Sequence, residues 1–331
     1  MKRFGLCMLV LILLASCTTS APPTVVPSGV PAPILSPTSA PTPVLPTFIP
    51  SPIPTATTPA LVPNFEHIVI IMFENKEFGS VIGNPQMPTY NRLAQEYTLL
   101  TQYYGIQHPS LPNYIALMGG DTFGIDKNCS DCFIDAPSLP DLIEASGRTW
   151  KTYQEDMPEP CFLGSTHLYA QKHNPFVYFD PIRLNPERCQ RSVVPLTALQ
   201  TDIETNSLPN FLFIKPNICN DSHDCELAVS DAWLTNLLNT LIPALDATAE
   251  SYFIAMLFEE GQGDHTCCGL PEPGGGRVPA VLYSPFAKNG FEDATPYTHY
   301  SLLKTISESW GLQYLGHAAE ENHVLIVAPW K

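Results

Sequence analysis

Beyond residue 63 the chain alternates between short apolar runs and longer amphipathic segments. Apolar runs of strand length are typical of strands buried on both faces of a mostly parallel sheet. These runs cover residues 67–73, 211–214, 252–258 and 278–283, and residues 99–104 form a further short strand. Apolar residues at helical spacing predict helices over residues 138–146, 226–245 and 300–310. Because strands alternate with helices, we expect an α/β fold, a three-layer sandwich with a mostly parallel central sheet.

Ser110 lies at the junction between the strand over residues 99–104 and a segment with one apolar helical face. Serine is a preferred N-cap residue and Pro112 fits a first helical turn, so we expect Ser110 to cap a helix. The unpaired N–H groups and the positive dipole end at such a position favour an anion such as a phosphoryl group. Taken alone, the motif indicates only an ordinary helix cap.

Polar side chains follow several of the predicted strands, at the edge where open α/β sheets carry their active sites. They are Glu74 and Asn75 after the first strand, Asp221 and His223 after the 211–214 strand, Glu259 and Glu260 after the 252–258 strand, and His299 before the last helix. Carboxylate, amide and imidazole groups suit a divalent metal ion. Such an ion beside Ser110 would lower the pKa of the hydroxyl and make it a nucleophile.

Each of these positions also has a purely structural interpretation. Glu74-Asn75 is typical of a strand-end turn, the segment 221–224 of an acidic turn, and Glu259-Glu260 of a solvated loop. His299 fits a helix cap. Independent turns have no reason to gather metal ligands at several strand ends, so their joint occurrence indicates one site.

The first sixteen residues have the features of an export signal. An apolar run too short to span a bilayer follows Lys2 and Arg3, and the ending Leu14-Ala15-Ser16-Cys17 resembles a bacterial lipobox. We therefore expect a signal peptide over residues 1–16 and a lipid on Cys17 at the outer face of the cell envelope; an ordinary cleaved signal is the alternative. Residues 17–63, rich in Pro, Thr and Ser, predict an extended tether or a low-complexity leader without a role. Residues 64–331 are long enough for one catalytic domain.

The charge and the cysteines restrict the class of protein. With a formal net charge of −16 the chain is a poor nucleic-acid binder, and an anionic substrate would need local compensation such as a metal ion. Eight cysteines lie beyond residue 63, and this even number in an exported chain suggests disulfides. The spacing permits local pairs between Cys129 and Cys132 and between Cys219 and Cys225. Zinc binding by Cys129 and Cys132 is the competing interpretation.

Five short segments occur in a recognisable order along the domain. They are residues 74–78 (ENKEF), 108–114 (HPSLPNY), 172–175 (KHNP), 216–224 (PNICNDSHD) and 299–303 (HYSLL). Together they resemble the phosphoesterase family of bacterial acid phosphatases and phospholipases C, a branch of the alkaline-phosphatase superfamily. The similarity runs from about residue 67 to residue 316, essentially the whole domain.

The resemblance implies an alkaline-phosphatase-like fold and a metal-dependent phosphoesterase. It implies that Ser110 is the phosphorylated nucleophile, that Asn113 donates to a phosphoryl oxygen, and that His108 and His173 line the phosphate site. The implied metal ligands are Glu74, Asn75, Asp221, Glu259 and Glu260, with His223 and His299 as metal ligands or proton donors. Two positions depart from the family pattern, because Glu259 replaces the usual Asp and Glu77 the usual Ser, which makes that edge more acidic.

We therefore expect a lipid-anchored, extracytoplasmic phosphomonoesterase. It would use a divalent metal ion and act on small phosphate esters or phospholipid-derived substrates. A phosphodiesterase of phospholipase C type is one alternative, mildly favoured by the membrane anchor. A surface-binding lipoprotein, weakened in catalysis by the change at Glu259, is another. A cysteine-rich structural module does not explain the strand-end ligands.

Overall fold

The computed structural model describes residues 60–331. The expected signal peptide, the lipid on Cys17 and almost all of the expected tether therefore lie outside the described residues. Between residues 60 and 331, no helix combines the length and the apolar character that a membrane span requires.

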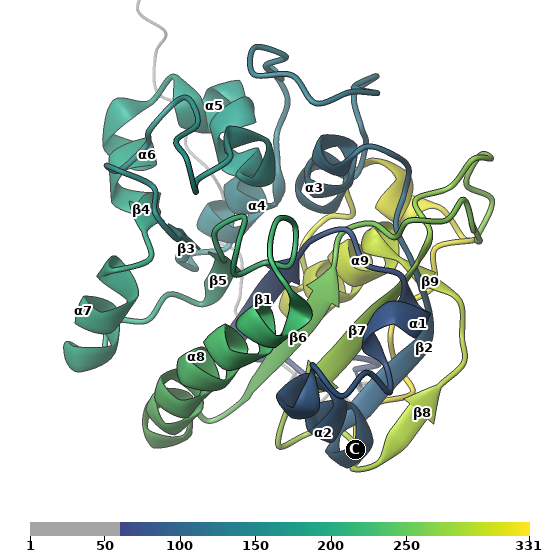
Figure 1. Cartoon of the computed structure of the whole chain (residues 1–331). Helices are drawn as coiled ribbons and strands as arrows, with labels where there is room; N and C mark the ends of the chain where they lie inside the picture. The colour runs from purple at the N-terminus through teal and green to yellow at the C-terminus, as the bar shows by residue number, and fades with distance from the viewer. Residues whose placement is uncertain (1–59) are drawn as a thin grey trace, which may run out of the picture. The chain divides into compact units, whose positions relative to one another are not determined.

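A nine-stranded sheet forms the centre of the described residues (Figure 1). Its strand order is β4-β3-β5-β1-β6-β7-β2-β8, with β9 paired to β2. Within it, β7 runs antiparallel to β6 and β2, and the other pairings are parallel. The strands are β1 (His67–Phe73), β2 (Thr98–Tyr104), β3 (Trp150–Gln154), β4 (Val193–Pro195), β5 (Phe211–Lys215), β6 (Tyr252–Phe258), β7 (Arg277–Tyr283), β8 (Phe291–Asp293) and β9 (Tyr297–Thr298). The expectation of a mostly parallel central sheet is confirmed.

Helices cover both faces of this sheet and complete the three layers (Figure 1). The pair α2 and α8 lies on one face, and α3 packs against α9 on the other. The helices are α1 (Phe78–Val81), α2 (Pro88–Glu96), α3 (Ser110–Gly119), α4 (Leu139–Ala145), α5 (Asp180–Arg183), α6 (Pro186–Ser192), α7 (Ala198–Glu204), α8 (Leu227–Thr248) and α9 (His299–Trp310). Short 3-10 turns lie at Gln171–His173, Pro175–Tyr178 and Gly316–Ala319.

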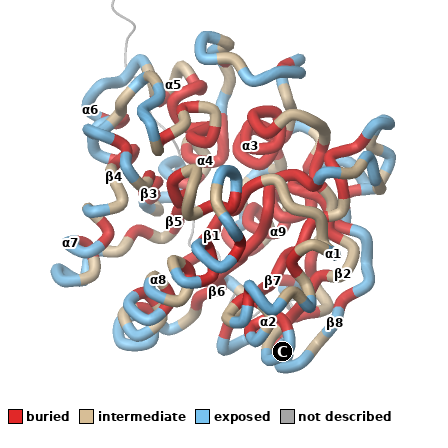
Figure 2. Tube along the Cα trace, in the orientation of Figure 1, coloured by how far each residue is buried: buried red, intermediate tan, exposed pale blue. Residues whose placement is uncertain are grey.

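The apolar runs of the sequence are the central strands. Every residue of β1, β5 and β6 is buried, and Figure 2 shows the sheet and the inner helices as the buried part of the chain. Strands covered on both faces need apolar side chains throughout, which is why their sequence shows no alternation. Polar residues therefore enter only where a strand ends.

The capping residues fix where two of the expected helices begin. Ser138 and Asp141 form a capping box at the start of α4, and Thr298 and Ser301 form one at the start of α9. α9 ends at Gly311, which adopts the left-handed backbone that glycine accommodates best. Both helices are confirmed within one or two residues of their predicted limits.

Four disulfides connect segments of the chain between residues 60 and 331. Cys129–Cys132 and Cys219–Cys225 are paired as the spacing permitted. The other four cysteines of the described residues form Cys161–Cys189 and the adjacent pair Cys267–Cys268. Because Cys129 and Cys132 are joined to each other, their interpretation as zinc ligands is not supported.

Candidate active site

Three neighbouring parallel strands end at the same edge of the sheet, and each brings a charged residue there. Lys215 is the last residue of β5, Glu74 directly follows β1, and Glu259 directly follows β6. The pairing of Phe73 with Phe258 places Glu74 beside Glu259. The prediction that polar residues gather at the strand ends is confirmed for this edge.

Ser110 is the first residue of α3, and its side chain does not cap the helix. The N-cap position falls on Pro109, so the expectation that Ser110 is the N-cap is wrong by one residue. The Ser110 hydroxyl instead lies 2.9 Å from Glu260 Oε1 and 3.3 Å from Glu74 Oε2. A serine held by two carboxylates rather than by a backbone N–H is placed for chemistry and not for capping.

Asn113 holds the loop that precedes Ser110. Its Oδ1 accepts hydrogen bonds from the N–H groups of Ile106 at 2.7 Å and Gln107 at 3.3 Å. Its Nδ2 lies 2.7 Å from the carbonyl oxygen of Gln107 and 3.2 Å from that of Pro109. Because the loop backbone engages both ends of the amide, the structure does not present Asn113 as a donor to a phosphoryl oxygen.

The carboxylates of Glu74 and Glu260 contact the Ser110 hydroxyl, that of Glu259 lies beside Glu74, and all three are buried. Glu259 Oε2 accepts a 2.8 Å hydrogen bond from the Asn75 N–H, whereas Glu259 Oε1 has no hydrogen-bond partner. Burial, with the nearby charge of Glu74, raises the pKa of Glu259, and burial also raises the pKa of Glu260 although hydrogen bonds to its carboxylate oppose the shift. The site thus holds more carboxylates than its cationic neighbours neutralise, which favours a bound cation.

Glu74 divides its two oxygens between two sets of neighbours. Oε2 faces Ser110, whereas Oε1 accepts from the Tyr114 hydroxyl and lies 3.2 Å from His173 Nε2 and 3.6 Å from Lys215 Nζ. Burial raises the pKa of Glu74, but the charges of His173 and Lys215 outweigh burial and hold the pKa well below its usual value. Glu74 is therefore ionised at neutral pH.

Asp221 contacts Lys215 and His173, the two residues that also lie near Glu74 Oε1. Its Oδ2 accepts from Lys215 Nζ and lies 3.5 Å from His173 Nδ1, and its Oδ1 accepts from the His223 N–H at 2.8 Å. Burial lowers the pKa of His173, and the Lys215 charge adds to this effect although Glu74 and Asp221 oppose it. Both oxygens of Asp221 thus have partners in the protein, and Oδ2 forms an ion pair with Lys215.

His299 and His108 differ in what their ring nitrogens contact. His299 is fully buried, with Nε2 at 2.6 Å from the Glu259 carbonyl oxygen and Nδ1 at 3.1 Å from the Tyr103 hydroxyl. Burial lowers the pKa of His299 to about 4, so its ring is neutral and both nitrogens are engaged, which fits neither expected role. His108 contacts Glu260 through Nδ1 and the Gly263 carbonyl oxygen through Nε2. Burial lowers the pKa of His108, but these two hydrogen bonds outweigh burial and raise the pKa overall.

His223 is the more accessible histidine of the group. Its side chain is 31% exposed, and its Nδ1 lies 2.6 Å from Asp224 Oδ1. The Asp224 carboxylate on Nδ1 fixes the orientation of the ring and leaves Nε2 toward the site. His223 is therefore better placed than His299 to exchange a proton with a bound molecule.

Glu77 lies against the loop after β6 rather than beside Ser110. Its carboxylate accepts from the N–H groups of Gln262 at 3.1 Å and Arg277 at 3.3 Å. Gly261 permits this approach, because a Cβ there would lie 1.8 Å from Glu77 Oε2. The extra acidity expected from Glu77 is thus directed to the loop backbone.

The residues fit a divalent metal ion in two overlapping ways. The first is the oxygen-only set of Glu74, Glu259, Glu260 and Ser110, in which the unpartnered Glu259 Oε1 leaves a ligand position free. The second is a mixed set, because donor atoms of Glu74, His173 and His223 lie within 4.8 Å of one another. Either set includes Glu74, the residue at the centre of the edge.

Sequence reasoning missed three residues that shape this site. Lys215 stands at a strand end as the glutamates do, so the same signal was present. Tyr114 fits the apolar face of α3, and nothing in its spacing indicates that its hydroxyl reaches Glu74. Asn128, whose Oδ1 accepts from the Leu111 N–H at 3.1 Å, comes from a distant loop and has no sequence signal.

Comparisons with known proteins concern the domain as a whole. Residues 84–313 match the Phosphoesterase family. The chain is 35% identical over 263 residues to the phosphate-repressible acid phosphatase of Penicillium chrysogenum, covering 76% of this chain and 60% of that protein. It is 31% identical over 264 residues to the phosphatidylinositol-3-phosphatase of Mycobacterium tuberculosis, covering 78% of this chain and 81% of that protein. The chain spans 56–63% of the length of three fungal relatives described as acid phosphatases or a probable acid phosphatase.

A solved structure shares the fold. A Vibrio parahaemolyticus protein of the alkaline phosphatase superfamily superimposes with a TM-score of 0.53 at 12% identity, covering 79% of this chain and 72% of that one. At this identity the likeness concerns the fold alone, and it confirms the expected alkaline-phosphatase-like sandwich. With the family match over residues 84–313 and the two relatives above 30% identity, the chain belongs to the Phosphoesterase family.

Proposed function

We propose that this chain is a metal-dependent phosphomonoesterase that hydrolyses phosphate esters through a phosphoserine at Ser110. The observation that carries the proposal is the position of the Ser110 hydroxyl, 2.9 Å and 3.3 Å from two buried carboxylates and free of the helix backbone. Acid phosphatases among the relatives support phosphoester chemistry. Glu74, Glu259 and Glu260 would hold a divalent ion, whose chemistry is to lower the pKa of the hydroxyl and to screen charge on the phosphoryl oxygens.

Ser110 begins the reaction by in-line attack on phosphorus. The Oγ–P bond forms as the ester P–O bond breaks, and the hydroxyl proton passes to Glu260 along the existing hydrogen bond. His108 lies on the other oxygen of Glu260 and supports that exchange. The alcohol leaves with a proton, for which His223 is the better-placed donor.

Water completes the reaction by attacking the phosphoserine. Its proton returns to His223, inorganic phosphate leaves, and Ser110 recovers its proton from Glu260. His108 and His173 border the position of the phosphoryl group. We assign Asn113 and His299 to positioning, because their polar atoms already contact the protein.

Asn113→Ala tests the positioning role. We expect the free energy of unfolding to fall by about 2–4 kcal/mol, because the substitution leaves the Ile106 and Gln107 N–H groups without their acceptor. Turnover of phosphate esters should fall as well, because this loop carries Ser110. Urea unfolding and steady-state kinetics measure the two effects.

Asn91→Ala is the matched control for this prediction. The Asn91 side chain also binds surrounding backbone, at Gly83 N and Val81 O, without touching the carboxylates. The control should lose stability and keep the turnover of its folded fraction. An Asn113 variant that keeps full turnover would remove the positioning role.

A substrate panel tests the proposed activity. Purified protein is stripped of metal, restored with Mn²⁺, Zn²⁺ or Mg²⁺, and assayed with matched monoesters and diesters of the same alcohol. We expect metal-dependent release of inorganic phosphate from the monoester. Preferential cleavage of the diester would replace the proposal with a phosphodiesterase, and no cleavage with any ion would favour a surface-binding protein.

The same proposal places the domain outside the cytoplasm. Four disulfides among the described residues are typical of exported proteins and support the expected export. The proposed lipid on Cys17 rests on the lipobox-like sequence of residues 14–17. A lipid-anchored enzyme would meet small phosphate esters or phospholipid-derived substrates, and the net charge of −16 disfavours nucleic acid. Metabolic labelling with a fatty acid, compared between wild type and Cys17→Ala, checks the anchor.

A further inference from the structure

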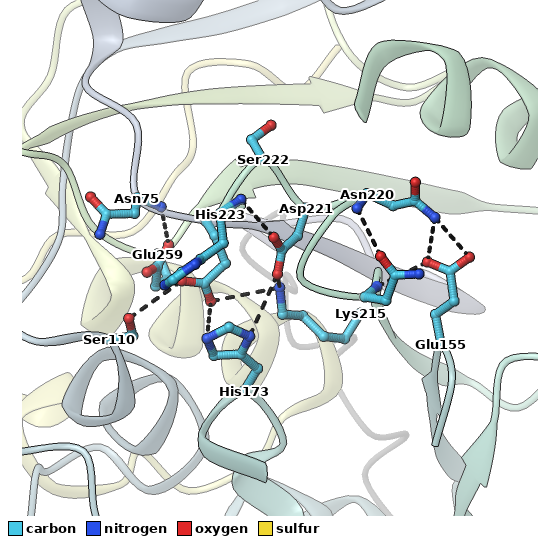
Figure 3. Close-up of polar contacts among 12 residues, drawn as sticks. Asn75, Ser110, Glu155, His173, Lys215, Asn220, Asp221, Ser222, His223 and Glu259 are labelled. Carbon is cyan, nitrogen blue, oxygen red and sulfur yellow. Dashed lines mark hydrogen bonds and ion pairs between the residues drawn. The ribbon is translucent and has the colours of Figure 1, made fainter. Parts of the chain in front are cut away.

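A lysine is buried among metal-ligand residues at the edge of the sheet (Figure 3). The Lys215 side chain is 2% exposed, and its Nζ donates to Asp221 Oδ2 and lies 3.6 Å from Glu74 Oε1. His173 closes a ring, because its Nε2 lies 3.2 Å from Glu74 Oε1 and its Nδ1 lies 3.5 Å from Asp221 Oδ2. Two carboxylates and an imidazole are usual ligands of a divalent metal ion. Here they surround an ammonium group instead.

We propose that the Lys215 ammonium takes the place of a second metal ion, so that the chain binds one divalent ion on the Ser110 side of Glu74. This inference rests on the metal binding in the proposed function. It goes further by setting the number of ions and by assigning Asp221 to Lys215. It also makes Lys215 a positioning residue, since its ammonium holds one oxygen of Glu74 away from Ser110.

The backbone fixes Lys215 in this position. Lys215 is paired with Gln154 of β3, and its carbonyl oxygen accepts from the Glu155 N–H at 3.0 Å. The Lys215 side chain therefore extends from a rigid strand end, and because it is 2% exposed its Nζ is shielded from solvent. A divalent ion bound to Asp221 Oδ2 would have to share that oxygen with the Lys215 ammonium, and like-charge repulsion opposes such sharing.

Around the second oxygen of Glu74, Oε2, the neighbouring charged groups are carboxylates instead of a lysine. Glu74 Oε2 faces Ser110, Glu259 Oε1 is buried without a partner, and Glu260 contacts the His108 ring. The carboxylates of Glu74, Glu259 and Glu260 lie on this side. Within the described residues, their one ion pair with a lysine or arginine is the contact between Lys215 and the other oxygen of Glu74. The uncompensated negative charge is therefore on the Ser110 side of Glu74, and the divalent ion is expected to bind there.

Counting bound ions tests this inference without measuring activity. The chain is saturated with Mn²⁺ by equilibrium dialysis, and Mn²⁺ per chain is measured by mass spectrometry of the element. We expect one ion in the wild type. Lys215→Met removes the charge but keeps the length of the side chain, and we expect it to bind two ions, because Asp221 and Glu74 Oε1 are released.

Two further variants separate the charge of Lys215 from general damage. Lys151→Met is the matched control, since Lys151 forms a comparable pair with Asp202 at 2.6 Å on β3, and it should keep one ion. Lys215→Met combined with Asp221→Asn should return the count from two ions to one. A Lys215→Met variant that stays at one ion would overturn the inference.

Variants that preserve Lys215 decide the question even if Lys215→Met does not fold. Asp221→Asn and His223→Asn should each keep one ion with an affinity within about threefold of wild type. Two ions in the wild type, or loss of the ion in either variant, would overturn the inference and favour a site that uses Asp221 or His223. If the wild type binds one ion but hydrolyses no ester, the proposed function is rejected and the inference about Lys215 stands. If the wild type binds two ions and hydrolyses esters, the inference is rejected and the proposed function stands.

Discussion

Ser110→Ala should lower kcat/KM for phosphate monoesters by at least about 10³-fold. The substitution removes the oxygen that forms the bond to phosphorus, and neither Glu74 nor Glu260 replaces it as a nucleophile in the same position. The fold should survive, because the side chain does not cap α3 and the N-cap position belongs to Pro109. Steady-state kinetics and thermal unfolding of the variant measure the two effects.

Ser230→Ala is the control for this prediction. Ser230 is also a fully buried serine, but its hydroxyl lies 2.6 Å from Ser222 and contacts none of the carboxylates. The Ser230 variant should keep the turnover of the wild type. If Ser110→Ala retained more than about a tenth of wild-type turnover while the control was normal, water rather than Ser110 would be the nucleophile.

Chelation should lower the hydrolysis rate by at least about 10²-fold and also lower the stability of the domain. Glu74, Glu259 and Glu260 are buried together, so removing a divalent ion leaves their charges uncompensated. An ion that binds only the folded chain adds about 2.7 kcal/mol at 100 times its Kd, and this amount disappears on chelation. Thermal unfolding with and without the chelator measures the loss.

Restoring the ion should recover both activity and stability in the same titration. Glu259→Gln keeps the shape of the side chain and removes one carboxylate, so it should weaken metal binding without unfolding the metal-free chain. A domain whose activity and melting temperature were both unchanged by chelation would contradict metal dependence. Glu259→Asp shortens the ligand by one methylene and should retain the metal.

The residues at this edge of the sheet were predictable from the sequence, because buried strands appear there as continuous apolar runs. β1, β5 and β6 are apolar except for His67 at the start of β1 and Lys215 at the end of β5, so the first polar residue that follows each apolar run marks where the strand ends. Parallel neighbours end at one edge, which is enough to bring Glu74 and Glu259 together without any knowledge of side-chain contacts.

The roles of individual side chains were less predictable, because they depend on contacts between distant segments. His299 is placed correctly at the start of α9, yet the carbonyl oxygen of Glu259 and the hydroxyl of Tyr103 engage its ring. Asn113 follows Ser110 by about one helical turn, a spacing that permits a contact with the substrate or with the preceding loop. In the structure its side chain binds the backbone of residues 106–109. Sequence spacing carries no information on that choice.

Lys215 shows a different limit. Its position at the end of β5 is as visible in the sequence as that of Glu74, but a single lysine beside an acidic segment suggests an exposed residue. Its burial follows from the pairing of β5 between β1 and β3, which brings Asp221 and Glu74 to either side of Nζ. Pairing order between strands is set by the whole fold and not by any local segment.

The phosphoserine at Ser110 is the central claim, and trapping it tests that claim most directly. The protein is mixed with a ³²P-labelled monoester, quenched in acid within milliseconds, digested, and mapped by mass spectrometry. We expect one labelled peptide, phosphorylated at Ser110, that forms before free phosphate appears and disappears as substrate is exhausted. Label on a histidine, or rapid turnover with no labelled peptide at any time, would contradict a phosphoserine mechanism.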